Sequence, residues 1–486
     1  MPASACQLPA NDVRVATPES VRTPTRMRRI RRVHFVGVGG AGMCGIAEIV
    51  LTQGYQVSGS DHHDSDVLAR LRTLGATVFV GHAAAQVSGA DAVVVSTAIP
   101  ESNVEVVEAH QRRIPVVPRA EMLGELMRYR HGVAVAGTHG KTTTTCMITE
   151  IFRAAGKDPT FVVGGLVKSA SANARLGAGN DIIVEADESD ASFLYLQPMT
   201  AVITNIDQDH LGTYGGDFEQ LKSAFIEFTH RLPFYGVVVL CIDDKETRGV
   251  MARMTRPLLT YGFASDADYQ AVDIAVDGMR TRFRALRPDG QPELDITLNL
   301  PGRHNVQNAL AAIAVASDEG LSDNAICAGL AAYAGVGRRF DVTSDVQVGA
   351  AKVVLVDDYG HHPTEVRAVI ATLRAVWPTR RVVMIYQLHR FSRTRDLFDD
   401  FVAVLSTVDV LVLLDVYPAG ERAIAGADAR SLGAAIQARG GITPLFCGDL
   451  DAVPGLLASI ARESDVIVTQ GAGNVSAISQ RLREKN

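Results

Sequence analysis

The chain is poor in cysteine and has no long apolar run. Its six cysteines are scattered through 486 residues, without a CxxC pair and without histidines at zinc-binding spacing. This pattern argues against a disulfide framework or a structural zinc site and is typical of reduced thiols in the cytoplasm. No uninterrupted apolar run approaches the roughly 20 residues that cross a bilayer. We therefore expect a soluble, cytoplasmic protein with no membrane partner.

The chain also lacks an excess of basic residues. It carries 47 Lys and Arg against 54 Asp and Glu, a formal net charge of -7, whereas proteins that bind nucleic acid are usually basic. We therefore expect small-molecule partners and no nucleic acid. A chain of 486 residues exceeds the size of one hydrophobic core, so several domains are expected. The sequence leaves monomer and homodimer open.

Short apolar runs alternate with helix-like stretches, which predicts an α/β fold. Three such units follow a polar leader: a Rossmann-like N-terminal domain, a central P-loop domain with a mostly parallel sheet plus a β-meander, and a Rossmann-like C-terminal domain. The expected boundaries are 1–27 for a disordered leader and 28–119, 120–337 and 338–486 for the domains. We expect the leader to be dispensable, and translation could start at Met27.

A glycine-rich turn follows the first predicted strand in "VHFVGVGGAGMCGIAEI". Gly37, Gly39 and Gly42 form GxGxxG, and Asp61 follows about 20 residues later, as in dinucleotide-binding folds. Backbone N–H groups at such a turn and the end of the following helix attract a diphosphate. The pattern alone leaves open a nicotinamide cofactor, another diphosphate, or close strand–helix packing without a ligand.

A stronger phosphate loop follows in "GVAVAGTHGKTTTT". Lys141 would bring a positive charge to the β- and γ-phosphates of a nucleotide, and the Thr142 hydroxyl would bind magnesium. Val135 stands where the common GxxxxGK[ST] motif has its first glycine. The structural alternative is a glycine turn followed by a threonine-rich helix start that binds nothing.

Acidic side chains follow the next two predicted strands, in "VEADESD" and "TNIDQDHLG". Ligands of parallel sheets bind at the carboxyl ends of the strands, so these oxygens could hold a hard cation. The candidates are Glu185, Asp187, Glu188, Asp207, Asp209 and His210, although solvated loop ends and a surface histidine would give the same pattern.

Two further segments carry candidate nucleotide contacts. In "GRHNVQNALAA", His304 could stack on a base and Asn305 could bond its edge, or Asn305 could simply cap the helix. In "GVGRRF", Arg338 and Arg339 lie at a domain joint, where an arginine could reach a transferring phosphoryl group or could only add surface charge.

The C-terminal unit places histidines and arginines directly after two predicted strands. "DDYGHHPTEV" contains Tyr359 and His361, and "HRFSRTRD" contains His389, Arg390 and Arg393. Paired arginine N–H groups bind carboxylates or phosphates, and a histidine can accept a proton from an attacking amine.

In order along the chain, these motifs resemble the Mur ligase family of peptidoglycan synthesis. The resemblance covers all but the leader and rests on "GVGGAGMCGIAEI", "STAIP", "GTHGKTTTT", "EADESDASF", "TNIDQDHL", "GRHNVQNALAA", "GVGRRF", "DDYGHHPTEV", "HRFSRTRD" and "DVYPAGE". Within the family it is most similar to the members that add L-alanine. Leu388 and Pro418 depart from the residues expected there.

The resemblance implies an amide ligation that consumes ATP with Mg²⁺, or Mn²⁺, in a bacterial cytoplasm. The lactyl carboxylate of UDP-N-acetylmuramate would become an acyl phosphate, and L-alanine would attack it with release of ADP and phosphate. Implied catalytic residues are Lys141, Glu185, His210, Arg339 and His361. Implied ATP contacts are Gly137, Thr138, His139, Gly140, Lys141, Thr142, Thr143, His304, Asn305 and Arg339, and implied metal positions are Thr142, Glu185 and His210.

The first glycine loop would then hold UDP instead of NAD. Implied contacts with the nucleotide sugar are Gly37, Gly39, Gly40, Gly42, Ser60, Asp61, Ser96, Arg390 and Arg393. The implied amino-acid pocket consists of Tyr359, His361, His389 and Tyr417. Remaining alternatives are a recycling ligase that adds an intact tripeptide, an NAD-dependent oxidoreductase and a non-catalytic nucleotide-binding regulator.

Overall fold

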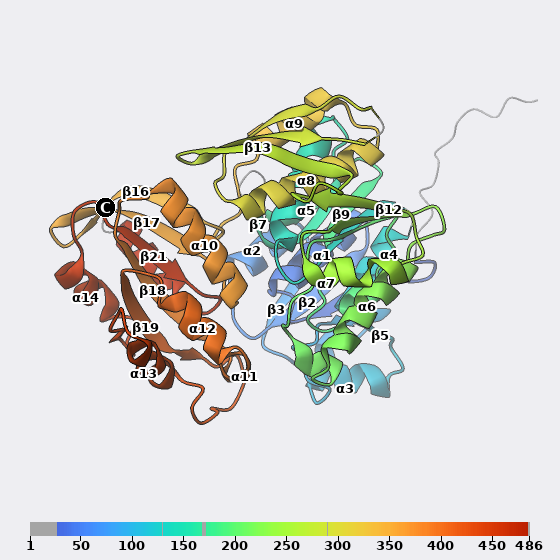
Figure 1. Cartoon of the computed structure of the whole chain (residues 1–486). Coiled ribbons are helices and arrows are strands. Elements are labelled where there is room, and N and C mark those ends of the chain that lie inside the picture. Colours follow the sequence, from blue (N-terminus) through green and yellow to red (C-terminus); the bar gives the residue numbers. More distant parts are fainter. Residues whose placement is uncertain (1–26, 129, 168–171, 289, 485–486) are drawn as a thin grey trace, which may run out of the picture.

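The computed structural model describes residues 27–128, 130–167, 172–288 and 290–484. The expected leader, apart from Met27, lies outside the described residues. Within them, no helix is both long and apolar enough to cross a membrane. The chain forms three successive α/β units, each with its own sheet (Figure 1), which confirms the predicted fold class.

The first unit has a five-stranded parallel sheet in the order β3-β2-β1-β4-β5. Its strands and helices are β1 (Arg32–Val36), α1 (Ala41–Thr52), β2 (Gln56–Asp61), α2 (Asp66–Thr73), β3 (Thr77–Val80), η1 (Ala84–Val87), β4 (Ala92–Val95), α3 (Val104–Gln111) and β5 (Val116–Pro118). Helix α4 (Arg119–Met127) leads into the next unit. The strand order reverses direction between β1 and β4, and such a switch point is where open parallel sheets bind ligands.

The central unit has a ten-stranded sheet, β15-β14-β13-β12-β11-β10-β6-β9-β7-β8. Its elements are β6 (His131–Ala136), α5 (Lys141–Ala154), β7 (Thr160–Val167), β8 (Ala172–Arg175), β9 (Asp181–Glu185), η2 (Ser192–Tyr195), β10 (Thr200–Ile203), η3 (Leu211–Tyr214), α6 (Phe218–His230), β11 (Val237–Cys241), α7 (Lys245–Val250), η4 (Met251–Arg253), β12 (Leu258–Gly262), β13 (Tyr269–Asp277), β14 (Arg280–Leu286), β15 (Leu294–Leu298), α8 (Arg303–Asp318) and α9 (Asp323–Ala332). The predicted β-meander is β13-β14-β15, and it continues the main sheet because β12 pairs with β13. Strand β8 is antiparallel to β7 at the other edge.

The C-terminal unit has a six-stranded sheet, β16-β17-β21-β18-β19-β20. Its elements are β16 (Asp341–Val348), β17 (Ala351–Asp358), α10 (Pro363–Val376), β18 (Val382–His389), α11 (Phe391–Asp396), α12 (Phe398–Leu405), β19 (Val410–Tyr417), α13 (Ala429–Arg439), β20 (Leu445–Phe446), α14 (Val453–Ile460), β21 (Val466–Gln470) and α15 (Ser476–Glu484). Strand β16 is antiparallel to β17, and the other pairs are parallel. The parallel strands are apolar runs because helices cover both faces of the sheet.

Candidate active site

The loop between β6 and α5 has the conformation that its glycines predict. Gly137 has φ +129° and Gly140 has φ +83°, a region that L side chains rarely adopt. A Cβ at Gly137 would also overlap Thr204, and a Cβ at Gly140 would lie 2.6 Å from Asn308 Oδ1. Helix α5 begins at Lys141 with no side-chain cap, so the N–H groups of its first turn are available to an anion.

The earlier part of this loop is tied to the end of β10. The His139 N–H donates to Asn205 Oδ1 (2.8 Å), and Asn205 Nδ2 donates back to the His139 carbonyl (3.0 Å). The hydroxyl of Thr138 accepts the N–H of Asp207 at 2.9 Å. The N–H groups of Thr138 and His139 are both used by Asn205, so the phosphate-binding N–H groups are expected from Gly140 onward.

Lys141 is partly buried in a carboxylate-lined position, with 13% of its side chain exposed. Its Nζ donates to the carbonyls of Gly137 (2.6 Å) and Thr138 (3.1 Å) and lies 2.8 Å from Glu188 Oε2. Burial alone would lower the pKa of Lys141, but the facing carboxylates raise it above its usual value. Burial raises the pKa of Glu188 to about 7 despite the lysine. A phosphate that reaches Lys141 would therefore replace Glu188 as its partner.

The three implied metal positions line one cavity between the central and C-terminal units. The Thr142 hydroxyl donates to Glu185 (3.0 Å to Oε1 and 2.9 Å to Oε2), and the Gly164 N–H donates to Glu185 Oε2 (2.7 Å). A hydroxyl and a carboxylate are the oxygen donors that Mg²⁺ and Mn²⁺ prefer. Burial lowers the pKa of His210, so it offers the neutral ring nitrogen that a metal needs.

A second cavity, of about 330 Å³, adjoins the loop and suits a nucleotide base. Thr143, His304, Asn305 and Arg339 are among its lining residues, and burial lowers the pKa of His304 to about 4. The capping alternative for Asn305 is wrong, because Gly302 is the N-cap and Asn305 lies within α8. The Asn305 amide donates to the carbonyl of Pro301 at 2.7 Å.

Arg339 lines both cavities. The residues on either side have left-handed backbone, with φ 59° at Arg338 and φ 52° at Phe340, an uncommon conformation for residues other than glycine. The Arg339 guanidinium lies 3.5 Å from Glu365 Oε1 and over the ring of Tyr359 at 5.2 Å. This sharp turn directs its charge toward the space between the phosphate loop and the C-terminal unit.

Four aromatic rings form the C-terminal wall, as the implied amino-acid pocket requires. Tyr359 meets His361 edge-on at 5.6 Å, His361 lies 5.5 Å from His389, and His389 stacks on Tyr417 at 5.5 Å. Burial is the main cause that lowers the pKa of His361 to about 3 and of His389 to about 4. Both rings are therefore neutral near pH 7 and are weak proton acceptors.

Arg390 and Arg393, which have the same expected role, differ in their hydrogen-bond partners. Arg393 is buried, and its guanidinium bonds Asp209 three times (Nε–Oδ1 3.1 Å, Nη2–Oδ1 2.8 Å, Nη2–Oδ2 3.0 Å). Its Nη1 donates to the carbonyl (3.1 Å) and Nδ1 (3.3 Å) of His389. Each of the three guanidinium nitrogens thus has a partner within the protein, which argues against a substrate contact. Both arginines line the cavity, but Arg390 keeps a buried Nε without a hydrogen-bond partner among the described residues.

The first glycine loop lies at the switch point of the N-terminal sheet. Gly37 has φ +75°, Gly40 is the N-cap of α1, and Ser96 follows β4 directly. The Gly39 N–H donates to Asp61 Oδ2 at 2.9 Å, so the carboxylate of Asp61 orders the loop. The helix start after Gly40 carries no side-chain cap.

Ser60 differs from its expected role. The Ser60 side chain is fully buried and its hydroxyl donates to Glu105 at 2.6 Å, so it is not available to a ligand. A Cβ at Gly42 would overlap the guanidinium of Arg119. Arg119 and Gly42 line a third cavity together with Glu185, which connects the first loop to the metal positions.

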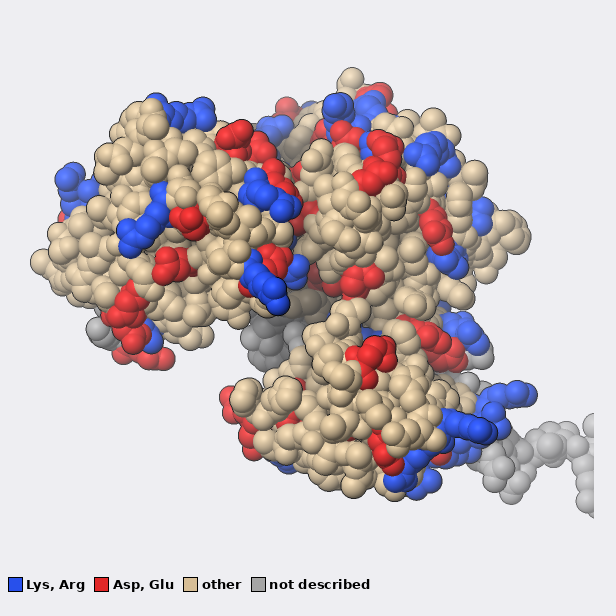
Figure 2. Space-filling view, turned by 90° about the horizontal axis from the view of Figure 1, so that it is seen from below, with Lys and Arg blue, Asp and Glu red and all other residues tan. Residues whose placement is uncertain are grey.

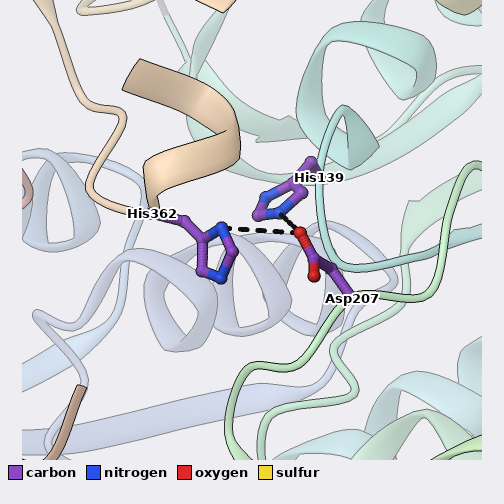
Figure 3. Close-up of side chains that lie close together, drawn as sticks. All are labelled: His139, Asp207 and His362. Carbon is purple, nitrogen blue, oxygen red and sulfur yellow. Dashed lines mark hydrogen bonds and ion pairs between the residues drawn. The ribbon is translucent and has the colours of Figure 1, made fainter. Parts of the chain in front are cut away.

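Sequence reasoning did not assign a cluster where the C-terminal unit meets the phosphate loop (Figure 3). Asp207 Oδ2 lies 3.1 Å from His139 Nε2 and 3.5 Å from His362 Nδ1, and it accepts the Thr364 hydroxyl at 2.8 Å. Glu365 lies 3.4 Å from His139 Nδ1. The signal that could have found Glu365 is the spacing H-x-x-E, because His362 and Glu365 form a capping box at the start of α10.

Comparison with protein-family models matches all three units. Residues 32–131 match the model described as "Mur ligase family, catalytic domain". Residues 135–316 match "Mur ligase middle domain", and residues 338–473 match "Mur ligase, glutamate ligase domain".

Solved structures with similar folds include three ligases. UDP-N-acetylmuramate-alanine ligase MurC of Thermotoga maritima is 28% identical with a TM-score of 0.77, over 93% of this chain and 98% of that one. A murein peptide ligase of Psychrobacter arcticus is 24% identical with a TM-score of 0.68, over 93% and 98%. The UDP-N-acetylmuramate:L-alanyl-gamma-D-glutamyl-meso-diaminopimelate ligase of Neisseria meningitides is 28% identical with a TM-score of 0.59, over 64% and 100%. Three consecutive family models match the chain, and its phosphate loop faces a C-terminal wall of histidines and arginines. The chain therefore belongs to the Mur ligase family.

Proposed function

We propose that this protein is an ATP-dependent ligase of peptidoglycan precursor synthesis, acting in a bacterial cytoplasm. It would join L-alanine to the lactyl carboxylate of UDP-N-acetylmuramate, with ATP and Mg²⁺ as cofactors. The observation that carries the proposal is one cavity lined both by Lys141, Thr142 and Glu185 and by the C-terminal His361 and His389. A carboxylate activated at the phosphate loop would therefore meet an amine held by the C-terminal wall.

The two halves of this cavity suit the two halves of the reaction. A carboxylate does not condense with an amine in water until phosphorylation gives it a good leaving group. Lys141, Arg339 and the first turn of α5 would stabilise charge on the transferred phosphoryl group. Thr142, Glu185 and His210 would hold the magnesium ion, which supplies charge neutralisation on the phosphates when bound.

The C-terminal wall would receive the amine. Arg390, with its unpartnered buried Nε, is better placed than Arg393 to bind an anionic group of a substrate. The pKa values of His361 and His389, about 3 and about 4, make both rings weak proton acceptors, so they would position L-alanine and would not take the proton from its ammonium group. The four aromatic rings lie in successive contact along the C-terminal wall, and a small amino acid would fit beside them.

The second candidate is the recycling reaction, in which an intact tripeptide replaces L-alanine. It is favoured by the similarity to the murein peptide ligases. Phosphate release from ATP and Mg²⁺ with UDP-N-acetylmuramate, in the presence of L-alanine or of the tripeptide, separates the two. Release that needs L-alanine supports the proposal, and release with the tripeptide alone supports the recycling reaction.

A variant of Lys141 tests whether the phosphate release depends on the phosphate loop. Lys141→Ala should lower turnover by about 100-fold or more, because one charge contact to a transition state contributes several kcal/mol. Near-normal turnover of a folded Lys141→Ala protein would remove the loop from the reaction. No phosphate release by the wild type with either amine would overturn the ligase proposal itself.

A further inference from the structure

The cluster of His139, Asp207 and His362 has the composition and spacing of a metal site. His139 comes from the phosphate loop, Asp207 follows β10, and His362 is the N-cap of α10. One ligand atom from each residue lies within 4.8 Å of the other two. Two imidazole nitrogens and a carboxylate oxygen suit Zn²⁺ and similar ions, whereas Mg²⁺ prefers oxygen ligands alone.

The two distances from Asp207 to the histidines are near those of tetrahedral coordination. With metal–ligand bonds of about 2.0–2.2 Å, the ligand atoms of a tetrahedral site stand roughly 3.3–3.6 Å apart. The Asp207 oxygen lies 3.1 Å from His139 Nε2 and 3.5 Å from His362 Nδ1. Because His139 and Asp207 line the nucleotide cavity, a water molecule can reach the fourth position.

Each histidine also presents the correct ring nitrogen. His139 turns its other nitrogen, Nδ1, toward Glu365 at 3.4 Å, the carboxylate–histidine arrangement that orients metal ligands in proteins. The backbone N–H of Thr364 donates to His362 Nδ1 at 3.2 Å. Nδ1 of His362 therefore carries a lone pair, which this hydrogen bond occupies until a metal ion takes its place.

From this arrangement we propose that His139, Asp207 and His362 bind a divalent transition metal ion, represented by Zn²⁺, at a site separate from the implied magnesium position. Binding would release the proton that His139 shares with Asp207 and would exchange the Thr364 hydrogen bond at His362 for a metal bond. The ion would connect the central unit to the C-terminal unit. If the proposed ligase function holds, Zn²⁺ would then slow turnover by holding the two units together.

The test is Zn²⁺ titration of the full chain by calorimetry, in excess Mg²⁺ and without ATP or substrates. We expect one ion per chain in the wild type and a loss of at least tenfold in affinity in His362→Ala. Glu365→Gln should weaken binding by about 10–100-fold, as is typical when the carboxylate behind a metal-binding histidine is lost. Co²⁺ in place of Zn²⁺ should show the visible absorption of a tetrahedral complex.

His210→Ala is the matched control, because it removes a histidine from the magnesium position alone. Undiminished Zn²⁺ binding in His210→Ala, together with loss in His362→Ala, supports the proposal. Equal binding in wild type and His362→Ala, or loss of binding in His210→Ala, overturns it. If His362→Ala does not fold, as judged by circular dichroism, Asp207→Asn takes its place with the same criteria. Since no substrate is present, these outcomes do not depend on the ligase reaction.

Discussion

The central unit joins its two neighbours through surfaces of opposite chemistry. Its joint with the N-terminal unit is apolar, since one buried core cluster includes Phe35 of β1, Leu123 of α4 and Ala134 of β6. A Cβ at Gly45 in α1 would overlap the Cβ of Ala174 in β8, so these elements pack closely.

The joint with the C-terminal unit is polar. The buried residues of the C-terminal cores all come from Phe340 onward, with Met279 of the central unit packed against one core. The other contacts with the central unit include Arg393–Asp209, Thr364–Asp207 and Glu365–His139. Figure 2 shows acidic and basic side chains gathered along the hollow beside the left lobe, which is the C-terminal unit.

The difference between the two joints indicates which of them can open and close. Apolar packing has no alternative partner in water and stabilises one arrangement, whereas ion pairs can exchange partners with water or with a charged ligand. The implied ligands of the second joint are ATP, a carboxylate and an amine, all of which are charged. We therefore expect opening and closing at the polar joint and a fixed apolar joint.

The largest effect is expected from Arg393→Ala at the polar joint. The change leaves the carboxylate of Asp209 buried without its partner, which costs about 3–5 kcal/mol in comparable buried pairs. We expect the C-terminal unit to undock, measured as a larger radius of gyration by small-angle X-ray scattering. Arg393→Lys, which keeps the charge but loses the planar fork, should have an intermediate effect. An unchanged radius with Ala would contradict the assigned role.

A smaller effect is expected from Gly45→Leu at the apolar joint. The added side chain must displace Ala174, and such overpacking costs about 1–3 kcal/mol. We expect a lower midpoint of thermal unfolding with no change in the radius of gyration. Gly249→Ala, in a helix where a Cβ meets nothing within 4 Å, is the control and should not destabilise the protein. Undocking in Gly45→Leu without loss of stability would show that the joints do not differ as described.

An acid dependence is expected at the polar joint alone. The pKa of His389 is lowered to about 4 by burial and by its neighbours Arg393 and Arg390. A lowered histidine pKa means that docking is fully stable above the unfolded pKa of about 6.5 and loses stability as pH falls from there toward 4. Partial exposure reduces the expected change to about 1–2 kcal/mol.

This pH effect can be followed by small-angle X-ray scattering between pH 7.5 and 4, a range that covers the interval between the unfolded and folded pKa values of His389. The radius of gyration of His389→Gln should increase less than that of the wild type as the pH falls, because the variant lacks the group that gains a proton. Identical profiles for the two proteins would exclude His389 as the responsible group.

The smallest effect is expected from Thr97→Val. The Thr97 hydroxyl donates to Asp190 Oδ2 at 3.1 Å across the apolar joint, in an exposed position. Exposed polar contacts contribute little, so we expect a change below about 1 kcal/mol in urea-unfolding free energy. A loss as large as that of Gly45→Leu would mean that this joint, too, depends on polar contacts.

Local patterns accounted for much of the fold. The alternation of buried strands with helices predicted three α/β units, and the glycines of "GTHGKT" predicted the turn before α5. Long-range pairing was harder to predict: the antiparallel edge strands β8 and β16 leave no distinct local pattern. The order of strands within each sheet likewise follows from packing.

The sequence by itself determined which chemical groups follow which strands, because backbone preference and apolar periodicity act over a few residues. Only the tertiary structure decided their partners. It bonded Arg393 to Asp209, 184 positions away, and Thr364 to Asp207, 157 positions away. It also placed Ser60 against Glu105, 45 positions away. Such pairs form when whole units pack together, and the spacing of residues along a chain carries no information about that approach.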